Sequence, residues 1–573
     1  MKKTVNKVVV LGIDGLDPKI LDIDFKAKLL PNLLKIKKTG AYSKLITTEP
    51  PQSPVAWASF TTGKDPAKHG VYDFIVRDPR DYSLDLVWSA NLDNLYDAKP
   101  FWVALEKQGT PTKILFLPNT FPPSKLKGEM LSGMGTPDLL GTAGKNSFYT
   151  SGHNKQNSRG NQIKLSGQKL INTEIFGPKK MTVPMEIKKL NKNEISIKIQ
   201  GQLIKLSKGK FSNWITVKFK TGIFSSIPGM IKFYLSSIEP DLDLYMSPIN
   251  IDPKNPYKPI SHPKDYSRHL ADKYGLFYTQ GLPHDTFALE EGVFTEEAFL
   301  ENAESIFIER KNIFLGELAD FKTGVFFNYV GVTDTIQHMY WRFLDKKNSQ
   351  YKNTILKYYQ KIDLLVGETL KCLSPDDALI ILSDHGFGPF NYEFNLNSWL
   401  RDEGFLCLEN NNKTGGELLQ NIMWSKTKAY GIGYNGIYLN LLGREGQGIV
   451  SNKSKKALKN LIKNKLLKAV NPFNNKKLVK NIYFKEELGI AINDNKAPDI
   501  FIGYYKGARA SWSTAVGKTL EKVFSKRNSK WKGDHLFDAT EVPGILFTNK
   551  PHDLKNPKIT DTILLVNKFL KME

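Results

Sequence analysis

The sequence predicts an α/β protein, in which helices flank a central, mostly parallel sheet and a β-rich insertion interrupts the core. Strand-like and helix-like segments alternate over residues 1–142 and again over residues 266–573, as in proteins with a parallel sheet. Between these parts, residues 143–265 carry turn residues and runs that alternate apolar with polar side chains, a pattern typical of half-buried strands. The length of 573 residues exceeds what one hydrophobic core usually supports, so we expect two or more units.

The expected helices and strands follow from apolar spacing and turn residues. Helices are expected near residues 18–38, from Val55, and near residues 296–318, 350–371 and 560–570. Core strands are expected at residues 8–13, 113–117, 325–331, 379–383, 499–504 and 543–547, and insertion strands at residues 194–200 and 214–220. Three of these core strands are followed by an aspartate, either directly or within a few residues. These strand ends are the basis for the metal site predicted below.

Composition excludes several classes of protein. The chain has only two cysteines, Cys372 and Cys407, so neither a disulfide framework nor a thiolate metal cluster is expected. No apolar run approaches the roughly 20 residues that a membrane-spanning helix needs. The apolar stretch near the N-terminus is too short for a secretory signal, and we therefore expect a cytoplasmic protein without a transmembrane segment.

The formal net charge is +23, and lysines spread along the whole chain account for most of it. A nucleic-acid-binding protein more often concentrates its charge in a stripe or tail, and the sequence shows no dedicated nucleic-acid-binding motif. Lysine-rich segments such as Lys453-Ser-Lys-Lys and Lys463-Asn-Lys are typical of solvated helix faces. The surplus charge could still attract polyanionic substrates or an anionic membrane surface.

Carboxylates and imidazoles follow three of the predicted strands. Asp14 follows residues 8–13, Asp334 follows residues 325–331, and Asp384-His385 follows residues 379–383. Ligands of open α/β sheets bind outside the carboxyl ends of the strands, so these residues predict one metal site built from distant segments.

The local spacing supports this prediction. Asp334 and His338 share one helical face if a helix begins at that strand end. Asp384 and His385 can reach one region only if the chain turns, which Gly386 permits. Each signal alone also fits an ordinary surface helix or a capped turn. Carboxylate and imidazole ligands suit Zn²⁺ or Mn²⁺.

Ser53 is the candidate nucleophile. Pro54 suits the first turn of a helix, so Ser53 is expected at the N-cap, beside free backbone N–H groups and the positive end of the helix dipole. That position favours a phosphoryl anion. An ordinary serine cap explains the same residues when they are considered alone.

The full set of motifs resembles the alkaline phosphatase superfamily. The order is Asp14, Ser53 with Thr62-Gly63 and Pro66…His69-Gly70 after it, Asp334-x-x-x-His338, Asp384-His385 and Gly533-Asp-His535. The resemblance spans nearly the whole chain and is strongest to the type I phosphodiesterase/nucleotide pyrophosphatase branch. Within that branch it is strongest to a cytoplasmic group described as predicted phosphohydrolase or phosphomutase.

The resemblance implies an alkaline-phosphatase-like sandwich with two divalent metal ions, Zn²⁺ or alternatively Mn²⁺. One ion would be bound by Asp14, Asp384, His385 and the Ser53 oxygen, and the other by Asp334, His338 and His535. Ser53 would attack a small-molecule phosphodiester or phosphomonoester, and water would hydrolyse the resulting phosphoserine.

Two departures from the family pattern matter. Leu536 follows His535 where the family often has glycine, and no arginine stands beside Ser53 to hold phosphate. The sulfatase pattern also fails, because Pro54 directly follows Ser53. We name Asn119 and Arg509 as candidate substrate contacts, although an ordinary surface position explains either residue equally well.

Two other functions remain open at this point. A phosphomutase or phosphotransferase would use the same site with an acceptor hydroxyl in place of water. A basic protein with an inactive site would bind polyanions without a tightly held metal.

Overall fold

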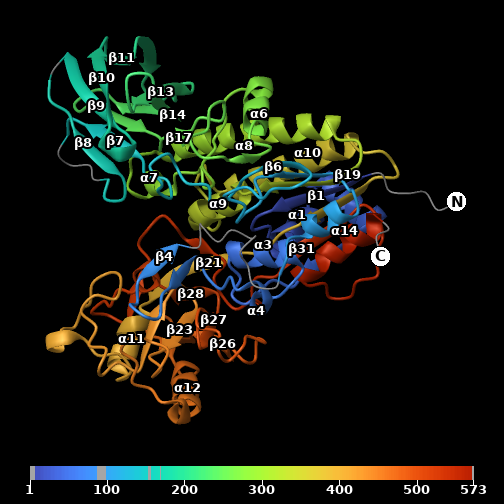
Figure 1. Cartoon of the computed structure of the whole chain (residues 1–573), viewed down its shortest axis with the longest axis vertical. Helices are drawn as coiled ribbons and strands as arrows, with labels where there is room; N and C mark the ends of the chain where they lie inside the picture. The colour runs from blue at the N-terminus through green and yellow to red at the C-terminus, as the bar shows by residue number, and fades with distance from the viewer. Residues whose placement is uncertain (1–6, 87–97, 153–156, 168, 571–573) are drawn as a thin grey trace. The chain divides into compact units, whose positions relative to one another are not determined.

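The computed structural model covers the whole chain and describes residues 7–86, 98–152, 157–167 and 169–570 (Figure 1). The chain forms two compact units, which we call unit 1 (Met1–Pro111 and Lys322–Glu573) and unit 2 (Thr112–Phe321). Unit 2 extends beyond the predicted insertion of residues 143–265 on both sides.

The central sheet of unit 1 is mostly parallel, as predicted. The strand order is β19 (Gly324–Val330), β1 (Lys7–Ile13), β20 (Ala378–Leu382), β31 (Gly544–Thr548) and β2 (Ala41–Leu45). Strand β1 pairs in parallel with β19 and β20, whereas β31 runs antiparallel to β20 and β2. All residues of β1, β19 and β20 are buried, as expected for strands covered on both faces.

Helices flank this sheet. They are α1 (Pro18–Lys26), α2 (Pro31–Thr39), α3 (Ser53–Thr62), α4 (Pro66–His69), α5 (Phe101–Lys107), α9 (Val332–Tyr340), α10 (Thr354–Lys371) and α14 (Thr562–Leu570). Helix α14 lies against β1 and α3, and α2 lies against β2, β31 and α10. The helical stretch predicted near residues 18–38 is two helices, because α1 ends before Lys28, whose φ of 56° is not helical, and Pro31 suits the first turn of α2.

The remainder of unit 1 forms smaller sheets around a second apolar core. One sheet contains β28 (Gly507–Ala510), β21 (Gly388–Phe394), β29 (Phe524–Lys526) and β30 (Gly533–Asp534). Another contains β22 (Ala429–Ile432), β23 (Gly436–Leu439), β27 (Ile500–Tyr504) and β26 (Val479–Phe484). The pairs β3 (Ile75–Arg77) with β4 (Leu84–Leu86) and β24 (Val470–Asn471) with β25 (Lys476–Lys477), and helices α11 (Leu396–Asp402), α12 (Asn452–Leu466) and α13 (Trp512–Ala515), complete it.

Unit 2 is rich in strands, as predicted for its middle part. Its sheets contain β5 (Thr112–Leu115), β6 (Gly128–Leu131) and β18 (Ser261–His262); β9 (Leu170–Phe176), β10 (Thr182–Lys189), β11 (Glu194–Ile199) and β12 (Gln202–Ser207); β13 (Ile215–Lys220), β14 (Ser226–Ile231) and β17 (Asn250–Ile251); and β7 (Ser147–Thr150), β8 (Asn161–Lys164), β15 (Phe233–Ser237) and β16 (Asp243–Met246). Its helices are α6 (Tyr266–Tyr274), α7 (Thr286–Glu290) and α8 (Glu296–Asp320). None of the helices in the described part of the chain combines the length and the apolar character needed to cross a bilayer.

His69 joins α3 to the turn that follows α4. Its Nδ1 accepts the N–H of Val71 at 3.1 Å, so the ring proton lies on Nε2 and donates to Ser59 Oγ at 2.9 Å. The ring is fully buried, and burial lowers the pKa of His69 to about 3. His69 therefore anchors α3, the helix that begins with Ser53.

This buried neutral imidazole should make the protein sensitive to acid. Below the ordinary histidine pKa the unfolded chain binds a proton that the folded chain does not, so stability falls as pH decreases from about 6.5 toward 3. The expected slope is about 1.4 kcal/mol per pH unit. Urea unfolding at pH 7 and pH 5, with metal removed by chelation, should show His69→Gln losing about 2 kcal/mol less than the wild type. Equal losses would contradict this role of His69.

Candidate active site

Three strand ends of unit 1 deliver the predicted carboxylates to one edge of the sheet. Asp14 directly follows β1, Asp384 follows β20 after one residue, and Asp334 lies in the first turn of α9, which begins after β19. Because β19, β1 and β20 are parallel neighbours, their carboxyl ends meet at the same edge. Residues separated by more than 300 positions in the chain are therefore brought together.

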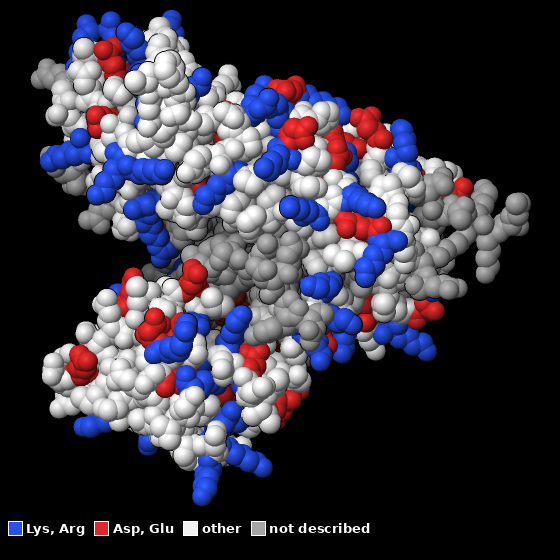
Figure 2. Space-filling model, in the orientation of Figure 1, with Lys and Arg blue, Asp and Glu red and all other residues white. Residues whose placement is uncertain are grey.

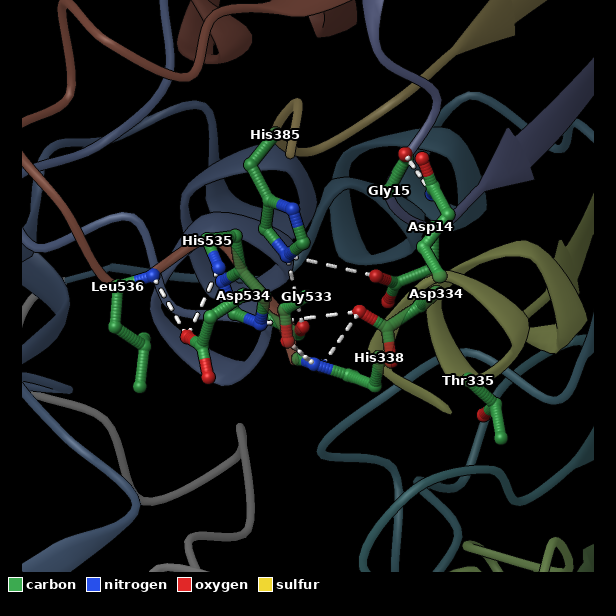
Figure 3. Close-up of polar contacts among 12 residues, drawn as sticks. Asp14, Gly15, Asp334, Thr335, His338, His385, Gly533, Asp534, His535 and Leu536 are labelled. Atoms are coloured by element: carbon green, nitrogen blue, oxygen red, sulfur yellow. Dashed lines mark hydrogen bonds and ion pairs between the residues drawn. The ribbon is translucent and has the colours of Figure 1, made fainter. Parts of the chain in front are cut away.

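Asp14 and Asp384 face the imidazole of His385, and Figure 3 labels two of these residues, Asp14 and His385. Its Nε2 lies 3.5 Å from Asp14 Oδ1 and 3.1 Å from Asp384 Oδ2. All three side chains are buried. The other oxygen of Asp14 accepts hydrogen bonds from Tyr329 Oη at 2.8 Å and Trp57 Nε1 at 3.2 Å, so the orientation of this carboxylate is fixed.

Asp334, His338 and His535 form the adjoining part of the site (Figure 3). His338 Nε2 lies 3.2 Å from Asp334 Oδ1, one helical turn away on α9, and His535 Nε2 lies 3.8 Å from the same oxygen. His535 follows β30, and its ring stacks on that of His385 with centroids 3.6 Å apart.

Each of the three imidazoles presents Nε2 to the carboxylates. The Nδ1 atoms of His338, His385 and His535 lie 2.7, 3.1 and 2.8 Å from the carbonyl oxygens of Gly533, Gly386 and Pro51. A carbonyl oxygen only accepts, so each Nδ1 carries a proton, and in the neutral form of each ring the Nε2 lone pair faces the site. Backbone hydrogen bonds of this kind orient metal-binding histidines.

Ser53 lies beside His385, with Oγ at 3.2 Å from Nε2. Two details of its prediction need correction. Ser53 is the first residue of α3, and Gln52 occupies the cap position. Val55 and Ala56 both donate their N–H groups to Gln52 O, and proline has none, so these positions offer no free N–H to an anion. The positive end of the helix dipole remains.

The buried charges of the site repel one another. Burial, followed by the charge of Asp334, raises the pKa of Asp14 to about 8. Burial and the charge of Asp14 raise the pKa of Asp384 well above its usual range. Burial and the neighbouring His535 hold the pKa of His385 well below its ordinary value. Burial alone lowers the pKa of His338, but the Asp334 carboxylate outweighs it and raises that pKa overall.

The donor set fits divalent cations. Asp14 Oδ1, Asp334 Oδ1 and Asp384 Oδ2 are buried oxygens without a hydrogen-bond donor among the described residues, and each faces an imidazole Nε2. Potential ligand atoms converge in two groups, Asp14–Asp384–His385 and Asp334–His385–His535. The first matches the predicted set apart from Ser53. In the second, His385 stands where His338 was predicted.

Arg509 lies in a second layer around the site. Its guanidinium is fully buried and donates to Asp534 Oδ2 at 2.6 Å, and Asp534 Oδ1 accepts the N–H groups of His535 and Leu536. The structure therefore pairs Arg509 with a carboxylate of the protein itself. Its contact with substrate stays a prediction. Asn119 belongs to unit 2, where it is buried with a φ of 61°, and its contact with substrate stays a prediction.

Sequence reasoning left several supporting residues unassigned. Asp534 stood in the quoted motif beside His535 without a role, and Trp57 and Tyr329 were given none. Asp534 was open to prediction, because it precedes His535 as Asp384 precedes His385. The contacts of Trp57 and Tyr329 with Asp14 depend on how α3 and β19 pack, and no local pattern signals them.

Comparisons with known proteins agree with this architecture. The profile of the family described as type I phosphodiesterase/nucleotide pyrophosphatase matches residues 8–514. No curated protein sequence matches the chain. Among solved structures, phosphonoacetate hydrolase from Sinorhizobium meliloti 1021, in complex with phosphonoacetate, is similar with a TM-score of 0.50 and 12% identity, over 99% of this chain and 96% of that one. An inactive murine ectonucleotide pyrophosphatase/phosphodiesterase 5, in complex with AMP, gives a TM-score of 0.44 and 11% identity over 99% and 96%.

The matched range covers most of the chain and includes the strand ends that carry Asp14, Asp334 and Asp384, as well as Ser53. The likeness to phosphonoacetate hydrolase supports the fold. The chain belongs to the type I phosphodiesterase/nucleotide pyrophosphatase family of the alkaline phosphatase superfamily and is a phosphoester hydrolase of that metal-dependent family.

Proposed function

We propose that this protein hydrolyses a phosphodiester or phosphomonoester at a two-metal site, through a phosphoserine at Ser53. The observation that carries the proposal is the position of Ser53 Oγ, 3.2 Å from His385 Nε2. The same imidazole faces Asp14 and Asp384. The one hydroxyl predicted to be nucleophilic therefore lies beside the most deeply buried group of ligands.

Two ligand sets support the proposal. Asp14, Asp384, His385 and Ser53 would hold one cation, and Asp334, His338 and His535 the other, with Zn²⁺ the first choice and Mn²⁺ the alternative. When bound, such cations supply Lewis-acid activation of hydroxyl groups and water and offset the charge of the phosphoryl oxygens.

The chain's own residues then account for a double displacement. Ser53 Oγ loses its proton to solvent as it attacks phosphorus. The bond from phosphorus to the leaving-group oxygen breaks, and that oxygen keeps the electron pair and takes up a proton. Water attacks the phosphoserine, releases the phosphoryl product and restores Ser53. Helix α3 orients the hydroxyl, and the backbone carbonyls that hold the three Nδ1–H groups keep the imidazoles in place.

Replacing Ser53 by alanine should lower turnover at least about a thousandfold, because the group that forms the covalent intermediate is lost. The measurement is hydrolysis of an aryl phosphodiester and an aryl phosphomonoester by protein reconstituted with Zn²⁺ or Mn²⁺. Thr61→Val, which removes from the same helix a hydroxyl without a hydrogen-bond partner among the described residues, serves as control and should keep turnover close to wild type. Full activity of Ser53→Ala would refute the phosphoserine route. Transfer to an added alcohol in place of water would identify a phosphotransferase.

Replacing Asp384 by asparagine should abolish turnover and reduce the bound metal from two ions to one per chain. Asp384 Oδ2 lies against His385 in the first ligand set, whereas Asp334, His338 and His535 keep their contacts. Metal content after desalting, measured by atomic emission, tests this, and Asp334→Asn should remove the other ion. Loss of both ions from Asp384→Asn would mean that the two sets are not separate sites.

Replacing Arg509 by methionine tests its role as a positioning residue. Burial alone would raise the pKa of Asp534, but Arg509 outweighs it and holds that pKa well below its usual range. Removing the guanidinium should cost about 3–5 kcal/mol of stability and weaken metal binding about 10- to 100-fold. Denaturant unfolding and metal titration provide these readouts, and adding Asp534→Asn should restore much of the stability. A rise in KM with unchanged stability would instead assign Arg509 to substrate.

A further inference from the structure

Two large apolar side chains stand fully in solvent at the tip of the β13–β14 hairpin of unit 2. Ile223 is 93% exposed and Phe224 is 101% exposed, in the turn between Lys220 and Ser226. Folding normally buries such residues, and adjoining exposed apolar side chains mark surfaces that bind another molecule.

A neighbouring turn contributes to the same surface. A Cβ on Gly177, in the β9–β10 turn, would lie 2.2 Å from Cδ1 of Phe219 near the end of β13, so this turn lies directly against the part of the hairpin next to its tip. Phe176, just before it, is 45% exposed. The turn between β11 and β12 is fastened to β13 as well, because Gln200 exchanges two hydrogen bonds with the backbone of Lys218.

Lysines surround this apolar tip. Lys218 and Lys220 on β13 are exposed, as are Lys179 and Lys180 in the β9–β10 turn. Among the described residues, none of these four forms an ion pair. Residues 170–225 contain 11 lysines and three glutamates, without arginine or aspartate, and so carry a net charge of +8 out of +23. Figure 2 shows blue side chains projecting from the region that Figure 1 labels β9, β10, β11 and β13, with few red ones among them.

We propose that this surface, Ile223 and Phe224 with the surrounding lysines, docks the protein on an anionic lipid bilayer. The exposed pair would enter the boundary between headgroups and acyl chains, where apolar side chains are stabilised. The lysines would meet the anionic headgroups, an attraction limited to about a Debye length from the surface. The phosphates of a nucleic acid could pair with the lysines, but a nucleic acid has no hydrocarbon layer into which Ile223 could insert. This inference concerns unit 2 and is independent of the proposed hydrolysis.

Vesicle sedimentation with the full-length protein tests the proposal. Binding is expected to vesicles of phosphatidylcholine with phosphatidylglycerol, to be much weaker with phosphatidylcholine alone, and to weaken as salt is added. Ile223→Ser/Phe224→Ser should lower affinity at least about tenfold through lost apolar insertion. Lys218→Gln/Lys220→Gln should lower it about tenfold or more and flatten the dependence on salt.

Matched controls come from unit 1. Leu442→Ser/Ile492→Ser removes two exposed apolar side chains, and Lys453→Gln/Lys456→Gln removes two exposed charges; neither pair should change vesicle binding. Circular dichroism should be unchanged in every variant.

Three results would overturn the proposal. The first is no binding of wild type to anionic vesicles at low salt. The second is equal binding by Ile223→Ser/Phe224→Ser, which would indicate a purely electrostatic attraction. The third is light scattering that shows a wild-type dimer dissociated by that variant in the absence of vesicle binding, which would make the tip an interface between two copies of the chain.

Discussion

The site depends on one electrostatic constraint, the confinement of three carboxylates at one edge of a buried parallel sheet. Asp14 and Asp384 are buried, and Asp334 is largely so. Among the described residues, no lysine or arginine forms an ion pair with any of them. Isolated buried carboxylates either bind protons or bind a cation. The raised pKa of Asp14 and Asp384 describes the first state. The imidazole nitrogens that face the carboxylate oxygens supply the further ligand atoms that the second state needs.

The backbone supplies the rigidity that such a site needs. Carbonyl groups of Pro51, Gly386 and Gly533 hold the imidazole rings of His535, His385 and His338. The hydrogen bond from His535 Nδ1 to the carbonyl oxygen of Pro51 also joins the C-terminal part of unit 1 to the loop before Ser53. His535 and Ser53 are therefore tied to the same short segment, so movement of either would disturb the other.

The strand ends could be predicted because their signal is local: an apolar run that stops at an aspartate marks the point where a buried strand reaches the rim of the sheet. His535 was singled out because a site with Asp334 and His338 lacks a third ligand, and through the resemblance, since a turn containing histidine has no spacing that distinguishes it. The cap at Gln52 and the pairing of Arg509 with Asp534 depend on hydrogen-bond partners chosen in three dimensions. The full extent of unit 2 was not predicted for a similar reason, because β5, β6 and α8 show the same local patterns as the elements of unit 1.

The positive charge of the chain is interpreted differently once the helices and strands are located. Spread evenly, lysines would indicate solvated surfaces. In residues 170–225 they instead dominate a set of short strands, and the only large side chains in the turn at residues 221–225 are Ile223 and Phe224. A strand is predicted from the alternation of apolar and polar residues. An apolar pair inside a turn does not contribute to that pattern and so gives no signal. The exposure of Ile223 and Phe224 becomes evident only when β13 and β14 pair and place the turn between them in solvent. The lysines and the apolar pair then belong to the same surface.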